Sequence, residues 1–87
     1  MQADKEQVTR LLKTARGQID GILRMIEEDR YCIDISTQIL ATDAILKRAN
    51  KEVLTAHMKH CLLFAATEEE RAAKIDELVQ VLEKLTK

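Results

Sequence analysis

Two cysteines and a histidine are the residues of this 87-residue chain whose types and spacing could do chemistry together. His57 and Cys61 are four residues apart, so on a helix both side chains would project from the same face. Thiolate and imidazole groups are soft or borderline ligands that suit Cu(I), Zn(II) or Ni(II). His60 and Cys61 make a poorer pair, because adjacent helical residues point about 100° apart. The spacing therefore favours a metal site that includes His57 and Cys61.

Cys32 is a third candidate ligand, but it lies 29 residues before Cys61. That separation is about 43 Å along a continuous helix, so the two sulfurs of one chain cannot meet on it. If two copies packed antiparallel around a two-fold axis near residues 45–46, Cys32 of one copy would lie beside His57 and Cys61 of the other. Each of the two equivalent sites would then hold two sulfurs and one nitrogen. Three ligands are enough for Cu(I) and one short of tetrahedral Zn(II).

Each of these residues also has a purely structural interpretation. Free cysteines are common in protein cores, and a histidine on an apolar helix face is usually a satisfied core residue. The joint pattern favours a site, because Cys32 occupies the mirrored end of the helix that carries His57 and Cys61.

Three helices are expected to position these residues, because apolar side chains recur at intervals of three or four along the chain. The first helix opens at Asp4, with Gln7 three residues later in a capping-box pattern. It ends at the polar stretch 27–30. The second begins near Cys32 and meets no glycine or proline through residue 66, which makes it about 50 Å long. Such a rod is too long for a small three-helix globule to cover.

The third helix is expected to begin at Thr67, with Glu70 completing a second capping box. Its apolar residues form one stripe, which is expected to be buried: Ile75, Leu78, Val79, Leu82 and Leu85. The expected fold is therefore an all-α, three-helix protomer with a long central helix that forms an antiparallel dimer.

The composition restricts the protein to a few classes. The length predicts one domain over residues 1–87, and so small a chain buries little enough surface that self-association is expected. A content of 46% hydrophobic and 33% charged residues excludes simple disorder, and two glycines with no proline argue against an all-β fold. No segment is apolar enough to cross a membrane, and the polar amino terminus has no signal-peptide core, so the cytoplasm is the expected compartment.

Around Cys32, His57 and Cys61 the sequence resembles the copper-sensitive operon repressor (CsoR) family of bacterial transcriptional regulators. The resemblance covers nearly the whole chain. It rests on the segments Arg16-Gly17-Gln18, Gly21-Ile22, Arg24-Met25-Ile26-Glu27, Tyr31-Cys32-Ile33-Asp34, Gln38, Ala56-His57-Met58 and Cys61. The family's sensing motif is a cysteine, a histidine 25 residues on, and a cysteine four later, as Cys32, His57 and Cys61 are spaced here. In Cu(I)-sensing members a tyrosine precedes the first cysteine and a glutamate lies on the third helix; Tyr31 and Glu77 match these positions.

The resemblance implies a helical dimer of dimers that binds operator DNA when metal-free and releases it when Cu(I) binds between protomers. The candidate phosphate-contacting residues lie on two helices: Arg10, Lys13, Arg16, Lys47, Arg48 and Lys51. Arg48 matches a family position that contacts DNA. The sequence departs from the family at Leu11, where relatives often carry arginine, although Arg10 lies beside it.

Three other interpretations remain. Persulfide-sensing members of the same family use two cysteines, here Cys32 and Cys61, but usually lack the histidine between them. Nickel-type members usually replace the last cysteine with histidine, and other members respond to formaldehyde. Outside the family, the chain could be a helical interaction module with inert core cysteines. An enzyme is not expected, because no phosphate loop, catalytic triad or paired-carboxylate pocket is identifiable.

Overall fold

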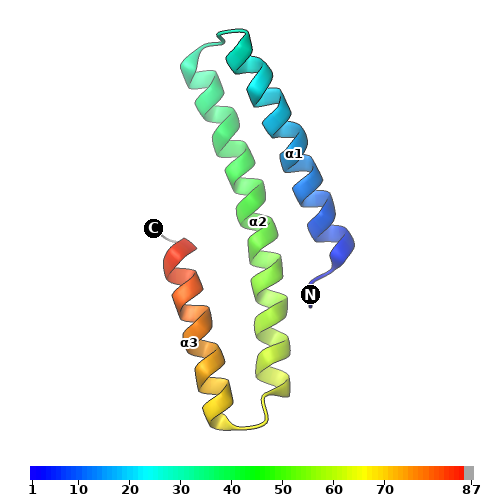
Figure 1. Cartoon of the computed structure of the whole chain (residues 1–87), viewed down its shortest axis with the longest axis vertical. Helices are drawn as coiled ribbons and strands as arrows, with labels where there is room; N and C mark the ends of the chain where they lie inside the picture. The colour runs from blue at the N-terminus through cyan, green and yellow to red at the C-terminus, as the bar shows by residue number, and fades with distance from the viewer. Residues whose placement is uncertain (86–87) are drawn as a thin grey trace. The chain divides into compact units, whose positions relative to one another are not determined.

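The fold is a set of three α-helices joined by short turns. The structure, a computed structural model, describes residues 1–85 and contains α1 (Lys5–Glu27), α2 (Cys32–Phe64) and α3 (Glu68–Leu85), with no strand in that range (Figure 1). At 33 residues, α2 is the longest helix. The predicted all-α protomer with a long central helix is confirmed. The last two residues of the predicted domain, 86–87, lie outside the described part.

The helix boundaries follow from local side-chain chemistry. Asp4 caps α1, since its carboxylate accepts hydrogen bonds from the backbone N–H groups of Glu6 (3.0 Å) and Gln7 (3.4 Å). Thr67 caps α3 by accepting a hydrogen bond from the Glu70 N–H at 3.0 Å. The Glu70 carboxylate accepts in turn from the N–H of Ala66 at 2.8 Å, rather than from Thr67 as a standard capping box would have it.

The turn between α1 and α2 fixes where Cys32 lies. The N–H groups of Glu28 and Arg30 bond back to the carbonyls of Arg24 and Met25, at 3.0 Å each. Asp29 adopts a left-handed conformation with φ of 52°, which aspartate tolerates better than most residues. The chain then enters α2 directly at Cys32.

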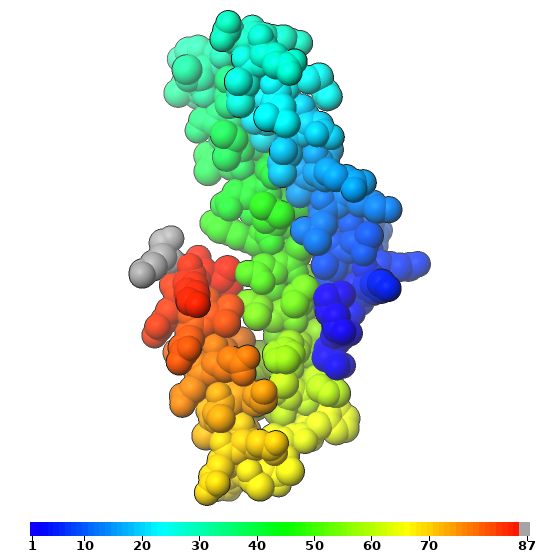
Figure 2. Space-filling model, viewed as in Figure 1, coloured from blue at the N-terminus to red at the C-terminus, as the bar shows by residue number. Residues whose placement is uncertain are grey.

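The chain groups into two compact units, and α2 contributes to both. One unit comprises Asp4–Glu52, in which α1 lies alongside the first part of α2 (Figure 1). The other begins at Val53 and includes the first three residues; in it α3 lies alongside the last part of α2. Figure 2 shows side chains of neighbouring helices in contact within each unit.

The core of the Asp4–Glu52 unit is narrow. Its buried residues recur at seven-residue intervals on each helix: Val8, Ala15 and Ile22 from α1, and Thr42 and Ala49 from α2. A seven-residue repeat is typical of a helix pair that packs along one seam. Thr42 is 5% exposed, and its hydroxyl lies 2.8 Å from Gln18 Oε1 on α1 and 3.1 Å from the carbonyl of Gln38. This polar contact links the two helices inside an otherwise apolar seam.

Thr42→Val is expected to lower the free energy of unfolding by about 1 kcal/mol, because it removes the buried hydroxyl that bonds across the seam. Thr37→Val is the matched control, since the exposed Thr37 hydroxyl bonds only to the carbonyl of Ile33 in its own helix, at 2.8 Å. Urea unfolding at one fixed protein concentration measures both. Equal losses in the two variants would show that the Gln18 contact contributes nothing.

Much of the apolar surface stays uncovered in a single protomer. No large side chain in residues 1–85 is fully buried, and Leu40, Leu63 and Phe64 are 65%, 77% and 73% exposed. The expected burial of the α3 stripe is wrong for the single chain: Ile75, Val79, Leu82 and Leu85 are exposed and Leu78 is half-buried. Each compact unit contains one pair of helices, and each pair leaves apolar side chains of its helices exposed. None of the described helices combines the length and apolar character that a bilayer crossing requires.

Candidate metal centre

His57 and Cys61 form the one donor pair that a single chain assembles among its described candidate ligands. Both project from the last part of α2, and His57 Nε2 lies 3.4 Å from Cys61 Sγ. Two ligands at about 2.0 and 2.3 Å from one metal ion are separated by about 3.3–3.8 Å, so the pair already has the spacing of shared ligands. His57 is exposed and Cys61 is half-buried. Both donors are therefore accessible on one helix face.

A small pocket surrounds this pair within the unit that begins at Val53. Residues of α2 and α3 line it: Leu54, His57, Cys61, Lys74, Glu77, Leu78 and Val81. Glu77, matched to the family's glutamate in sequence, thus shares a pocket with His57 and Cys61. Its carboxylate lies 3.7 Å from the ammonium of Lys74. The pocket therefore combines the donor pair with apolar side chains, one carboxylate and one ammonium.

Cys32 and Tyr31 belong to the other unit. Cys32 is the first residue of α2, is exposed and carries a free thiol, and Tyr31 is 68% exposed just before it. Within residues 1–85, no three His, Cys, Asp or Glu side chains gather closely enough to hold a metal ion. One chain therefore offers the ligands of one site in two separate groups: a His57–Cys61 pair, and an exposed thiol at the start of α2.

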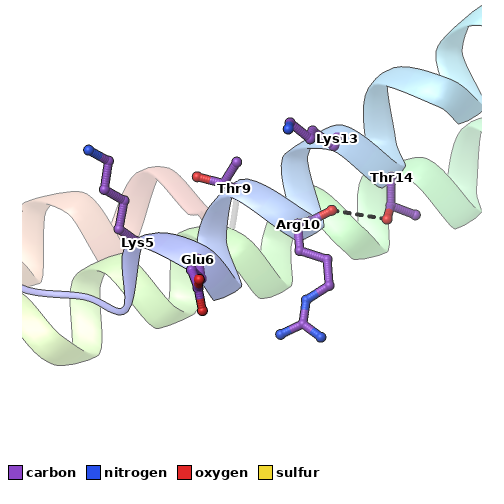
Figure 3. Close-up of a pocket in the computed structure, with 6 residues that line it drawn as sticks. All are labelled: Lys5, Glu6, Thr9, Arg10, Lys13 and Thr14. Carbon is purple, nitrogen blue, oxygen red and sulfur yellow. Dashed lines mark hydrogen bonds between the residues drawn. The ribbon is translucent and has the colours of Figure 1, made fainter.

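The basic candidates all lie in the Asp4–Glu52 unit and are all exposed: Arg10, Lys13, Arg16, Lys47, Arg48 and Lys51. Arg10 donates a hydrogen bond to Gln7, and Lys47 pairs with Asp43 at 3.0 Å. Figure 3 shows the shallow depression on α1 where Arg10 and Lys13 project from the ribbon. Leu11, where the sequence departs from the family pattern, is half-buried on α1.

Two basic residues that line these pockets, Lys5 and Lys74, were not predicted from the sequence. Lys5 lines the same depression on α1 as Lys13, and its spacing of eight residues from Lys13 is the signal that could have found it (Figure 3). Lys74 lies beside the His57–Cys61 pair, and its spacing of three residues from Glu77 on α3 was the available signal.

Comparison with known proteins gives one consistent answer. A family model described as a metal-sensitive transcriptional repressor matches residues 4–84. The copper-sensing transcriptional repressor CsoR of Bacillus subtilis (strain 168) is 40% identical over 84 residues, covering 97% of this chain and 83% of that protein. CsoR of Mycobacterium ulcerans (strain Agy99) is 44% identical over 71 residues; the match covers 82% of this chain but 61% of that longer relative.

Solved structures agree with the sequence comparison. The crystal structure of the copper-sensing repressor CsoR with Cu(I) from Geobacillus thermodenitrificans NG80-2 superimposes with a TM-score of 0.83 at 33% identity, covering 100% of this chain and 94% of that one. The nickel-responsive transcriptional regulator InrS superimposes with a TM-score of 0.78 at 27% identity, covering 97% and 94%. The resemblance seen in the motif residues is thus confirmed over the whole fold, and the chain belongs to the family of metal-sensitive transcriptional repressors that includes CsoR.

Proposed function

We propose that this protein is a Cu(I)-responsive transcriptional repressor. The metal-free form binds operator DNA, and Cu(I) held between two protomers by Cys32 of one and His57 and Cys61 of the other lowers the DNA affinity. The observation that carries the proposal is the His57–Cys61 pair, with 3.4 Å between its donor atoms, in a pocket that also contains Glu77. The copper-sensing activity of the B. subtilis and M. ulcerans relatives supports the choice of metal.

The donor set fits Cu(I) on chemical grounds. Both cysteines are free, so two thiolates and one imidazole are available to each site. This soft, three-ligand set suits Cu(I), whereas structural Zn(II) sites take four ligands. Bound there, the metal would supply a link between two chains. Glu77 would accept a hydrogen bond from the ring N–H of His57 that faces away from the metal, and Tyr31 lies next to the thiol of Cys32.

The assembly that the site requires is an antiparallel dimer, which we place within a dimer of dimers. Cys32 is exposed at the start of α2, and the apolar faces of α2 and α3 stay uncovered in one chain. A second copy would cover those faces and bring its own Cys32 to the His57–Cys61 pair. Because α2 contributes to both compact units, we treat residues 1–87 as one sensing and DNA-binding domain, which works in the cytoplasm where its operator lies.

Repression and sensing are linked through a coupling free energy. A tenfold loss of DNA affinity on metal binding requires about 1.4 kcal/mol of coupling, which must equal the preference of Cu(I) for the DNA-free arrangement. Within each unit of residues 1–85 the neighbouring helix runs alongside α2 instead of crossing it steeply, as the helices of a DNA-binding helix-turn-helix do (Figure 1). The exposed basic side chains of α1 and α2 are therefore the proposed DNA contacts.

An anaerobic DNA-release titration tests the proposal. The metal-free protein is bound to operator DNA and titrated separately with Cu(I), Zn(II), Ni(II) and an inorganic polysulfide. Release by Cu(I) in the presence of reductant is the expected result. Release by polysulfide and not by Cu(I) would replace the proposal with a persulfide sensor that uses Cys32 and Cys61. Absence of DNA binding in every condition would leave a helical interaction module.

Arg48→Ala is expected to weaken operator binding and to reduce the slope of log affinity against log salt by about one for each protomer that contacts the duplex. Arg48 is exposed on α2 and forms no ion pair with another described residue, so its guanidinium is available to a phosphate. Lys59→Ala is the control, because Lys59 is an exposed cation of the other unit. Fluorescence anisotropy over a series of salt concentrations measures both slopes, and equal slopes in the two variants would remove Arg48 from the interface.

A further inference from the structure

Lys74 occupies an unusual place beside the proposed metal ligands. It lines the pocket that contains His57, Cys61 and Glu77, and also a second pocket that contains His60, Cys61 and Glu70. Of the described residues that line these two pockets, Lys74 is the only lysine or arginine. Its ammonium lies 3.7 Å from Glu77 Oε2, and its side chain is 47% exposed. Lys74 thus lines both of the pockets that Cys61 lines, and it brings the one positively charged side chain of the described residues to them.

The charge of the proposed site depends on the metal. Two thiolates and a neutral imidazole give one net negative charge with a monovalent ion, but no net charge with a divalent ion. A nearby ammonium therefore favours the monovalent complex over the divalent one by its attraction to one unit charge. The ratio of the two affinities does not depend on how far the thiols are protonated before binding, because the same number of protons is released when either metal binds. Glu77 adds a second negative charge to the same pocket. Removal of the Lys74 ammonium would therefore leave the negative charge of both the site and Glu77 without a cation in the pocket.

We propose that Lys74 is a selectivity-determining residue, whose ammonium favours monovalent Cu(I) over divalent ions by offsetting the negative charge of the completed thiolate site. The inference rests on the proposed function and adds a residue outside the ligand set. Without the Lys74 ammonium, the site keeps all three ligands and Glu77, but only solvent and salt compensate the negative charge of the Cu(I) complex. Selectivity, rather than the presence of a site, is the property that Lys74 controls.

The test measures Cu(I) and Zn(II) affinities of the full-length protein by competition with chelators, under anaerobic conditions. Lys74→Met keeps the length and apolar stem of the side chain and removes the charge. The ratio of Cu(I) to Zn(II) affinity is expected to fall by about three- to tenfold, the attraction of one unit charge partly screened by water. Ag(I), a second soft monovalent ion, is expected to lose affinity relative to Zn(II) to the same extent. Lys74→Arg is expected to keep the wild-type ratio.

Lys59→Met is the matched control, because it removes one positive charge from the same unit without lining either pocket. An unchanged ratio in Lys74→Met, or an equal fall in Lys59→Met, would overturn the inference while leaving the proposed function intact. Failure of the wild-type protein to bind Cu(I) would overturn the proposed function and the inference together. Circular dichroism of each variant shows whether the helices are retained, so a fall in the ratio is not confused with loss of fold.

Discussion

Cys32→Ala is expected to lower the Cu(I) affinity of every site in the assembly by more than about a hundredfold. Loss of an outer partner of a metal ligand alone costs about 10–100-fold in affinity, and this change removes a ligand itself. The expectation holds even though Cys32 lies in a different unit from His57 and Cys61, because the thiol would come from the neighbouring protomer. Competition with a Cu(I) chelator, under reducing conditions, measures the loss.

Mixed protomers test the intersubunit origin of that thiol. A dimer of one Cys32→Ala chain and one Cys61→Ala chain should contain one complete site and one site with no sulfur at all. If each chain instead supplied its own ligands, both sites would keep one sulfur and bind equally weakly. Co-expression with two affinity tags isolates the mixed species, and Cu(I) titration counts its tight sites. One tight site per mixed dimer is the expected result, and two equal weak sites would reject the shared geometry.

Helix geometry explains which parts of this arrangement could be predicted from the sequence. The spacing of His57 and Cys61 is set by one turn of helix, so it needs no tertiary information, and the observed 3.4 Å contact follows from it. The caps at Asp4 and Thr67 also depend on neighbouring residues alone, and both cap residues were predicted correctly. The second half of each predicted capping box differs, because Gln7 accepts a hydrogen bond from Arg10 and Glu70 accepts one from Ala66. The absence of catalytic motifs predicted that the chain is not an enzyme, and the resemblance to CsoR implied a transcriptional regulator. The family assignment confirms both.

Burial could not be predicted in the same way. The apolar stripe of α3 shows which face of the helix avoids water, but it does not show which chain covers that face. Ile75 and Val79 are 43% and 45% exposed in one protomer, so the residues of their own chain do not bury them. Lys74 was missed for a related reason: a lysine on a polar helix face is usually solvated, and its place beside Cys61 depends on how α3 packs against α2.

His57→Ala is expected to separate metal binding from DNA release. The two thiolates remain, so the variant should still bind Cu(I), with an affinity closer to wild type than that of Cys32→Ala. His57 and Cys61 both share a pocket with Glu77 on α3, but only the imidazole has an N–H that could donate to the Glu77 carboxylate while the ring binds a metal. We therefore expect the ring, rather than the thiolate, to transmit the state of the site to α3. Without the ring, Cu(I) and DNA should bind with little mutual effect. The coupling free energy should fall from at least about 1.4 kcal/mol, a tenfold effect, towards zero.

The neighbouring histidine provides the control for this variant. His60 lies one turn from Phe64 on the same helix, with the two rings 4.8 Å apart, and it lines a different pocket from His57. His60→Ala should therefore keep the wild-type release of DNA by Cu(I). Operator affinity is measured for each variant with and without saturating Cu(I). Normal release by His57→Ala would show that the coupling runs through the thiolates, and equal losses in both variants would show that it depends on the general packing of this end of α2. Loss confined to His57→Ala would assign the coupling to the imidazole of His57, because His57 lines the pocket that contains Glu77 and His60 does not.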